Sequence, residues 1–337
     1  MYTELHAHSN FSFLDGASST RSLVERAVSL GMDALAITDH DGLYSACIFS
    51  KTAREAGIRP IIGAELTLEE DHHLTFLVEN ARGYANLSQL ITRAQLAGSK
   101  GKPVLSEAEL PGRTEGLICL SGCAKGKISR LLLKGERRAA YDAAKRYAAL
   151  FGKNNFYVEI EGHLLPEDRH LCLQLVDLAD VLGLETVVTN NVHYATRAEH
   201  ILHDVLTCIR HRVPLDRSAP FRRLNSEFYL KGEKEVMELP WLPREAIVRT
   251  GEVAGRCLFD LDFSSFSYPR FPLPEGETAT AFLRRLATEK ARARYGSLTE
   301  ELLRRIEDEI LLIEEKGLSG YFLVVRDIVE HARKVGI

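Results

Sequence analysis

Short runs of strand-forming residues alternate with helical patterns along most of this 337-residue chain, and this alternation constrains the fold more than any other feature. Strand followed by helix, repeated this often, predicts an α/β fold with either a parallel sheet or a (β/α) barrel. Periodicity alone leaves open whether the sheet closes. The predicted strands are 2–6, 34–38, 60–66, 73–78, 117–120, 156–160 and 186–189, and 73–78 is a candidate hairpin partner of 60–66.

Helices are predicted over 21–30, with Ser19 or Thr20 as its cap, and over 43–56. Beyond residue 215 the pattern changes, because prolines and Gly276 mark connecting segments and only helical spacing follows. Helices are predicted over 280–294 and 321–335. Between them, Ser297 and Glu300 read as the capping box of a further helix.

Potential metal ligands follow nearly every predicted strand. Carboxyl ends of strands in α/β sheets share one rim, so we expect these side chains to converge there. His6 and His8 alternate along the first strand and therefore face the same side. The further candidates at the strand ends are Asp15, Asp39, His40, Asp41, Glu65, Cys123, Glu161, His163, Asn191 and His193.

So many ligands exceed what one ion takes, which predicts two or three divalent ions. Imidazole, carboxylate and thiolate together leave zinc, manganese and iron open, with magnesium as a further candidate. Such ions polarise phosphoryl oxygens and activate water, which predicts hydrolysis of a phosphate ester. Asp15, His40 and Glu65 are the expected catalytic residues, and the two carboxylates suit bridging positions. The remaining histidines lack a strand-end argument and are left out, including His73 and His203.

Composition narrows the functional classes. The formal net charge of −4 argues against a basic nucleic-acid-binding surface over the whole chain, although a local basic patch remains compatible with it. No apolar stretch approaches the ~20 residues that cross a bilayer, and six widely spaced cysteines fit a reducing compartment. The expectation is a cytoplasmic protein without membrane contact.

Several motifs resemble the PHP (polymerase and histidinol phosphatase) domain that opens the alpha subunit of bacterial C-family DNA polymerase III, particularly its error-prone branch. They are Glu4–Ser9 with Phe13–Gly16, Ile37–His40, Gly63–Glu65, Leu120–Cys123 and Thr189–Tyr194. Gly83–Leu87 and Gly317–Asp327 also resemble that subunit, the latter resembling the start of its palm domain.

The resemblance implies a distorted seven-stranded (β/α) barrel over residues 1–262 and a connector with the truncated beginning of the palm over 263–337. It also implies a trinuclear metal site and 3′-to-5′ exonuclease activity on a single-stranded DNA 3′ end. The ligands that it implies are His6, His8, Asp15, His40, Glu65, Cys123, His163, Asn191 and His193. The expected partners are DNA, the remainder of the polymerase chain, and other replication or translesion proteins. DNA synthesis on damaged templates and DNA repair are the implied parent functions, but the polymerase's catalytic aspartates are missing from this chain.

Asn191 stands where the family usually has Asp, so one metal position has a weaker donor. A catalytically silent module, stabilised by metal, is therefore the alternative hypothesis. A stand-alone phosphatase for small phosphate esters is a third, which the palm-like segment argues against.

Overall fold

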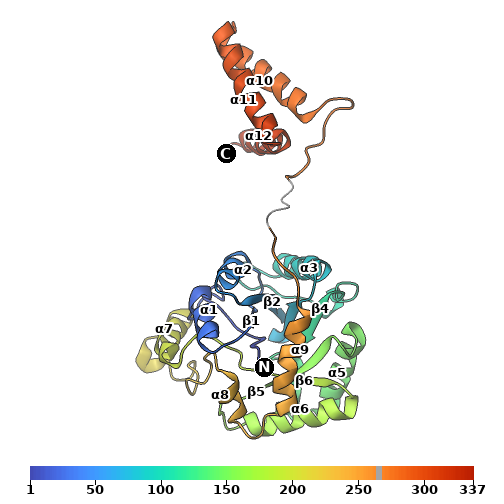
Figure 1. The fold of residues 1–337 in the computed structure, drawn as a ribbon, viewed down its shortest axis with the longest axis vertical. Helices are drawn as coiled ribbons and strands as arrows, with labels where there is room; N and C mark the ends of the chain where they lie inside the picture. The colour runs from blue at the N-terminus through green and yellow to red at the C-terminus, as the bar shows by residue number, and fades with distance from the viewer. Residues whose placement is uncertain (263–267) are drawn as a thin grey trace. The chain divides into compact units, whose positions relative to one another are not determined.

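The computed structural model describes residues 1–262 and 268–337, and its chain divides into two compact units, Met1–Leu261 and Asp262–Ile337 (Figure 1). The predicted second domain, 263–337, begins with five residues that lie outside the described ones. Each unit is described by itself below.

A curled six-stranded sheet forms the centre of the first unit, with its strands in chain order. The strands are β1 (Ala34–Ile37), β2 (Arg59–Leu68), β3 (His72–Val78), β4 (Leu117–Leu120), β5 (Phe156–Glu161) and β6 (Glu185–Thr189). The predicted hairpin is confirmed, because β3 pairs antiparallel with β2 and also with β4, whereas the other neighbours are parallel. The sheet is therefore mixed, not wholly parallel. The three-residue turn η1 (Glu69–Asp71) is too short for the crossover that parallel pairing needs.

The predicted first strand, 2–6, is not a regular strand, yet it occupies a strand's place. On one side the Ala36 amide donates to the Glu4 carbonyl at 2.9 Å, and on the other the His8 amide donates to the Val192 carbonyl at 2.7 Å. Only one isolated parallel bridge, Ala7 with Val192, results. The segment thus links β1 to the residues after β6 and completes the predicted distorted barrel.

An apolar cluster fills the inside of the barrel at one end. Residues of α9 (Arg244–Arg256) and its C-cap contribute Val253, Ala254 and Cys257, so this helix closes that end. The strand residues of the cluster are Ala34, Ala36, Ile61, Leu77, Ile118, Leu120, Tyr157 and Val187, joined by Leu5. Side chains two apart share a face of a strand, so Glu159 follows Tyr157 and Thr189 follows Val187 toward the opposite end. The interior therefore changes from apolar to polar along the barrel.

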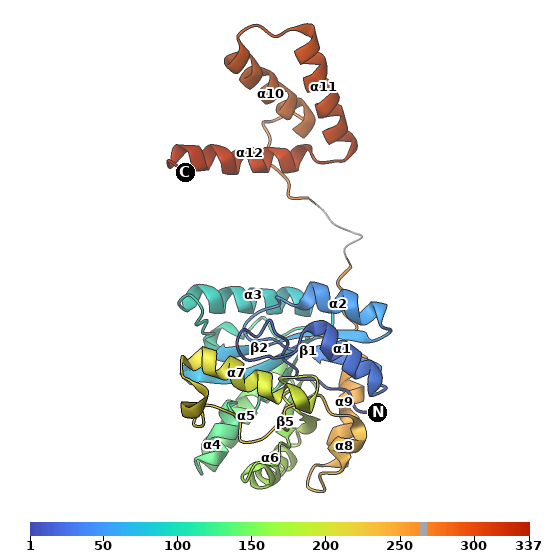
Figure 2. The same ribbon diagram turned by 90° about the vertical axis from the view of Figure 1, so that its left-hand side faces the viewer.

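Helices cover the outer face of the sheet, with α2 and α3 packed against β2 and β3 (Figure 2). The N-cap of α1 is Ser19, whose hydroxyl accepts from the Ser22 amide at 3.1 Å, which confirms one of the two predicted caps. The helices of this unit are α1 (Thr20–Ser29), α2 (Ala46–Glu55), α3 (Ala81–Ala97), α4 (Lys127–Leu133), α5 (Arg137–Phe151), α6 (Asp168–Leu182), α7 (His200–His211), α8 (Glu233–Met237) and α9.

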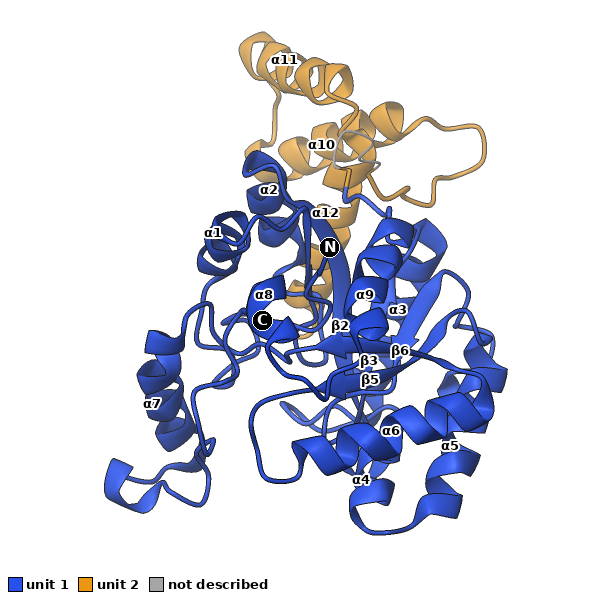
Figure 3. Cartoon of the chain, turned by 60° about the horizontal axis from the view of Figure 1, so that its bottom comes forward, with its two compact units in different colours: residues 1–261 blue, residues 262–337 orange. Residues whose placement is uncertain are grey.

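The second unit consists of α10 (Ala279–Tyr295), α11 (Glu300–Glu315) and α12 (Ser319–Lys334) (Figure 3). The predicted capping box at Ser297 is wrong: Thr299 is the N-cap, and its hydroxyl accepts from the Leu302 amide at 3.3 Å. Glu300 is then the first residue of the helix and lies too early to complete a box. Within the described part of the chain, no helix is both long and apolar enough to cross a membrane.

Candidate metal centre

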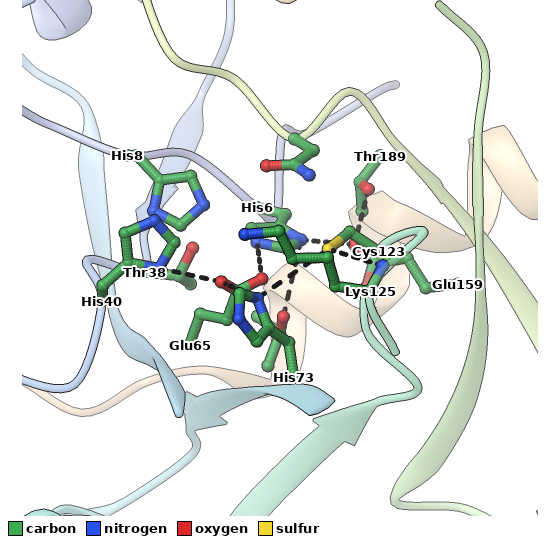
Figure 4. A network of polar contacts seen from close by, with 12 residues as sticks. His6, His8, Thr38, His40, Glu65, His73, Cys123, Lys125, Glu159 and Thr189 are labelled. Carbon is green, nitrogen blue, oxygen red and sulfur yellow. Dashed lines mark hydrogen bonds and ion pairs between the residues drawn. The ribbon is translucent and has the colours of Figure 1, made fainter. Parts of the chain in front are cut away.

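Buried imidazoles and carboxylates from distant parts of the sequence meet at the polar end of the barrel (Figure 4). His6, from the first segment, lies between a carboxylate of β2 and one of β5. Its Nε2 is 3.1 Å from Glu65 Oε2, and its Nδ1 is 2.7 Å from Glu159 Oε1. The Thr189 hydroxyl donates to that same Glu159 oxygen at 2.6 Å. All four side chains are buried.

Glu65 is the centre of this cluster, because three imidazoles surround its carboxylate. Besides His6, the Nδ1 atoms of His40 and His73 lie 2.8 Å and 2.6 Å from Oε1. The isolated parallel bridge between His40 and Glu65 fixes the loop after β1 beside β2. A carboxylate shared by several imidazoles has the position of a ligand that bridges two ions.

His73 was absent from the predicted set. That set used only the carboxyl ends of strands, but β3 is antiparallel, so its beginning lies beside the end of β2. The register confirms this arrangement, because His73 faces Thr67 across the hairpin. Had the predicted hairpin been combined with the strand-end argument, it would have placed His73 at the same rim.

Asp15 is the second carboxylate of the cluster around which several imidazoles gather. Its Oδ2 is 2.7 Å from His40 Nε2 and 3.7 Å from His193 Nδ1. The His8 ring stacks against the rings of both histidines, with centroids 4.2 Å from His40 and 4.7 Å from His193. His203, from α7, adds an Nε2 atom 3.8 Å from Asp15 Oδ1.

Asp39 supports the cluster from outside. Its Oδ1 accepts from the Ser9 amide and the Ser12 hydroxyl, both at 2.7 Å. The Ser12 hydroxyl lies 3.3 Å from His8 Nδ1 and accepts from the His40 amide at 3.1 Å. This chain of hydrogen bonds holds two histidines in place, as supporting residues commonly do at metal sites.

Among the described residues, four groups of ligand atoms lie close enough together to hold an ion. They are His6, His8 and Glu65; His40, Glu65 and His73; Asp15, His193 and His203; and His6, Glu159 and Glu161. Six of the nine ligands that the resemblance implies belong to these groups. Glu161 was expected only as a carboxylate at a strand end, and His73, His203 and Glu159 were not predicted. Strand alternation would have found Glu159, since it shares a face with Glu161.

Cys123, His163 and Asn191 belong to none of the four groups. Cys123 Sγ is 4.0 Å from His73 Nδ1. His163 uses its Nε2 on the Asn190 carbonyl at 2.8 Å and stacks on Phe228. Asn191 Oδ1 lies 3.1 Å from His193 Nε2. All three line a cavity of about 230 Å³ together with Asp15, His40, Glu65, His73 and His193, and their role as ligands stays a prediction.

The protonation of the cluster reflects its mixed charges. Burial lowers the pKa of His6, but Glu159 and Glu65 outweigh burial and raise that pKa well above its usual value. Burial raises the pKa of Glu65, but His73, His40 and His6 bring it well below its usual value. Burial and the neighbouring Glu159 both raise the pKa of Glu161. The protonation states of these buried groups therefore depend on one another.

Many buried donor atoms in the cluster lack a well-aligned hydrogen bond. They include His6 Nε2, His8 Nε2, both Glu65 oxygens, Glu159 Oε2, Glu161 Oε1 and His193 Nδ1. Leaving such atoms unsatisfied costs about 1–3 kcal/mol each. Divalent ions would satisfy them, and the mixture of imidazole and carboxylate suits zinc, manganese or iron. The residues present therefore fit a group of metal ions.

Comparison with family profiles gives two matches. Residues 4–163 match the PHP domain, and residues 281–337 match the bacterial DNA polymerase III alpha NTPase domain. Both matches agree with the resemblance recognised in the sequence motifs.

Curated relatives match along the whole chain. An error-prone DNA polymerase of Symbiobacterium thermophilum is 43% identical over 100% of this chain and 32% of its own length. A DNA polymerase III subunit alpha of Treponema pallidum is 36% identical over 99% of the chain and 30% of its own. An error-prone DNA polymerase of Cutibacterium acnes is 37% identical over 100% and 31%. The chain thus spans about a third of the length of these relatives.

Proposed function

Because this chain carries a PHP domain followed by a region of the bacterial DNA polymerase III alpha family, we propose that it is the N-terminal part of an error-prone DNA polymerase. The parent protein would synthesise DNA on damaged templates during replication and repair. The local activity proposed for the buried cluster is metal-dependent hydrolysis of the terminal phosphodiester at a single-stranded DNA 3′ end. The remainder of the polymerase chain and other replication or translesion proteins are the proposed partners.

One observation carries the hydrolytic proposal: Glu65 lies within 3.1 Å of three imidazoles, inside a cluster in which many buried donor atoms lack a well-aligned hydrogen bond. Bound divalent ions supply polarisation of a phosphoryl oxygen and activation of a water molecule. Glu65 would hold two ions together, while Asp15 and His40 orient each other through their 2.7 Å contact. These are the three residues to which we assign catalytic roles.

Two cationic side chains lie among the carboxylates that line the cavity beside the cluster, and they could contact a phosphate. Lys125, from the loop after β4, reaches across the cluster (Figure 4), and Arg223 lines the same cavity. The Arg223 guanidinium lies over the Phe228 ring, 3.7 Å from its centroid, which limits its directions of movement. Two cations at the entrance would bind and orient a phosphodiester against the cluster.

A structural module is the second candidate, and Asn191 favours it. Its amide oxygen is a neutral donor that contacts His193 Nε2, and Asn191 itself belongs to none of the four ligand groups. In this case the ions would stabilise the barrel by binding only its folded form, with no turnover.

The test uses the full chain loaded with Mn²⁺ or Zn²⁺ and a single-stranded oligonucleotide labelled at its 3′ end. We expect release of labelled mononucleotide, and its loss in Glu65→Gln. Glu69→Gln is the matched control, because Glu69 lies on the exposed turn after the same strand. No release with metal bound, or equal release by Glu65→Gln, would refute the hydrolytic proposal, and bound metal without release would support the structural module.

A further inference from the structure

Helix α7 directs two side chains at Asp15 from outside the barrel. His203 and Arg210 are seven residues apart and therefore share a helix face. Arg210 Nη1 lies 3.0 Å from Asp15 Oδ1, and His203 Nε2 lies 3.8 Å from the same oxygen. We propose that His203 is a ligand of a divalent ion held with Asp15 and His193, an assignment that rests on the metal-binding part of the proposed function.

The condition of the His203 ring is the first observation behind this assignment. His203 is only 3% exposed, yet neither of its ring nitrogens has a hydrogen-bond partner. A histidine buried for structural reasons normally donates one ring N–H to a carbonyl or carboxylate. The nearby Asp15 oxygen, at 3.8 Å, is too distant for a hydrogen bond, but an ion between the two side chains would satisfy the ring.

Distances within the group fit an ion. Asp15 lies 3.7 Å from His193 Nδ1 and 3.8 Å from His203 Nε2. Ligands ~2.1 Å from a tetrahedral ion lie ~3.4 Å from one another, so small side-chain movements suffice. The His193 and His203 rings meet edge to face, with centroids 5.7 Å apart, so the two rings are not stacked on each other.

Asn191 then has a defined role as the residue that positions His193. Its Oδ1, 3.1 Å from His193 Nε2, can accept a hydrogen bond from the N–H at that nitrogen. This hydrogen bond fixes the tautomer in which Nδ1 is free for the ion, as at many metal-binding histidines. His193 Nδ1 is one of the buried atoms without a hydrogen bond.

Arg223 competes for the same nitrogen, because it also contacts His193 Nε2. A guanidinium only donates, so it requires an unprotonated Nε2, whereas Asn191 Oδ1 requires a protonated one. An ion bound to Nδ1 requires a protonated Nε2, so it favours the hydrogen bond to Asn191. Arg223 is then free to turn toward the cavity that this arginine lines. Ion binding at this group would thus turn Arg223 toward an incoming anion.

Two imidazoles and one carboxylate define the class of ion. This set suits zinc, manganese or iron better than calcium or magnesium, which prefer oxygen ligands. Three protein ligands also leave positions open on the cavity side.

The test counts metal ions per chain after equilibration of the full chain with Zn²⁺ or Mn²⁺ and removal of free ions. We expect His203→Phe, of similar shape, to lose one ion per chain, and His203→Glu to retain it. His200→Phe is the matched control, because His200 lies one turn earlier on α7 and belongs to none of the four ligand groups. His203→Gln, which keeps a polar side chain but removes the imidazole, gives the same reading should the phenylalanine variant fail to fold.

An unchanged count in folded His203→Phe would overturn this inference and leave the proposed hydrolysis intact. Loss of one ion in both His203→Phe and His200→Phe would also overturn it, because the effect would then belong to the helix. A wild-type chain that binds no ion would refute both proposals, whereas a bound ion without nucleotide release would refute hydrolysis alone.

Discussion

Replacing Glu65 by Gln should remove most of the stabilisation that metal ions give to the first unit. Glu65 belongs to two of the four ligand groups, one with His6 and His8 and one with His40 and His73. An ion at 100 times its dissociation constant stabilises a folded protein by about 2.7 kcal/mol, so two ions contribute about 5 kcal/mol. For a unit of this size each kcal/mol shifts Tm by ~2–4 °C, which predicts a metal-dependent shift of roughly 10–20 °C.

The assay compares thermal unfolding by circular dichroism with excess EDTA and with excess Mn²⁺. The quantity to compare is the shift between these conditions, because Glu65→Gln also removes imidazole contacts from the metal-free protein. We expect the full shift in wild type and in Glu69→Gln, and only a few degrees in Glu65→Gln. An equal shift in Glu65→Gln would refute the bridging role of this carboxylate.

Three further predictions follow from the same geometry. Arg210→Gln should tighten ion binding at Asp15 about twofold to fivefold, because a partly exposed ion pair worth ~0.5–1 kcal/mol no longer competes, and calorimetric titration measures this. Burial lowers the pKa of His40, but Asp15 and Glu65 outweigh burial and raise that pKa to about 10, so a metal ion must displace the proton of His40. The apparent affinity for the ion should therefore rise with pH, by up to about tenfold per pH unit between pH 7 and 9. Calorimetry in buffers of different ionisation enthalpy should detect the released proton. In urea unfolding, Gly122→Ala should lower the free energy of unfolding of the first unit by about 1–3 kcal/mol more than Gly135→Ala does. Both glycines have a positive φ, but of the two only Gly122 would place a Cβ 2.3 Å from a backbone oxygen, that of His73.

The convergence of the site could be predicted because it follows from strand direction alone. Glu65 lies in β2 beyond its parallel pairing with β1, and His193 follows the end of β6. The carboxyl ends of parallel strands share a rim whatever the details of packing. The same rule excluded His73, because pairing direction is set by the length of the turn before β3, and not by the residues of the strand itself.

Other features required tertiary contacts that no local pattern contains. His203 lies on a helix, where its spacing is that of an ordinary core residue, and only the path of α7 past Asp15 gives it a chemical role. The first segment has the composition of a strand, but its hydrogen bonds to Ala36 and Val192 are too few and irregular for one. The start of α11 depends on the choice between two hydroxyl residues two positions apart, Ser297 and Thr299, which local sequence hardly distinguishes.

The two parts of the cluster differ in depth, and this difference separates the hydrolytic function from the structural one. His6, Glu65 and Glu159 have side chains at most 1% exposed and join the first segment to β2 and β5, so ions there stabilise the closed barrel. The Asp15 side chain is 14% exposed and pairs with Arg210, which competes with an ion for this carboxylate. An ion there therefore binds more weakly and stabilises the fold less. Asp15→Asn should therefore abolish nucleotide release while lowering the metal-dependent Tm shift by only a few degrees, whereas Glu65→Gln should lose both. If Asp15→Asn instead removed the Tm shift as fully as Glu65→Gln, the ions would act as one structural unit, and the assignment of separate roles to the two parts would be wrong.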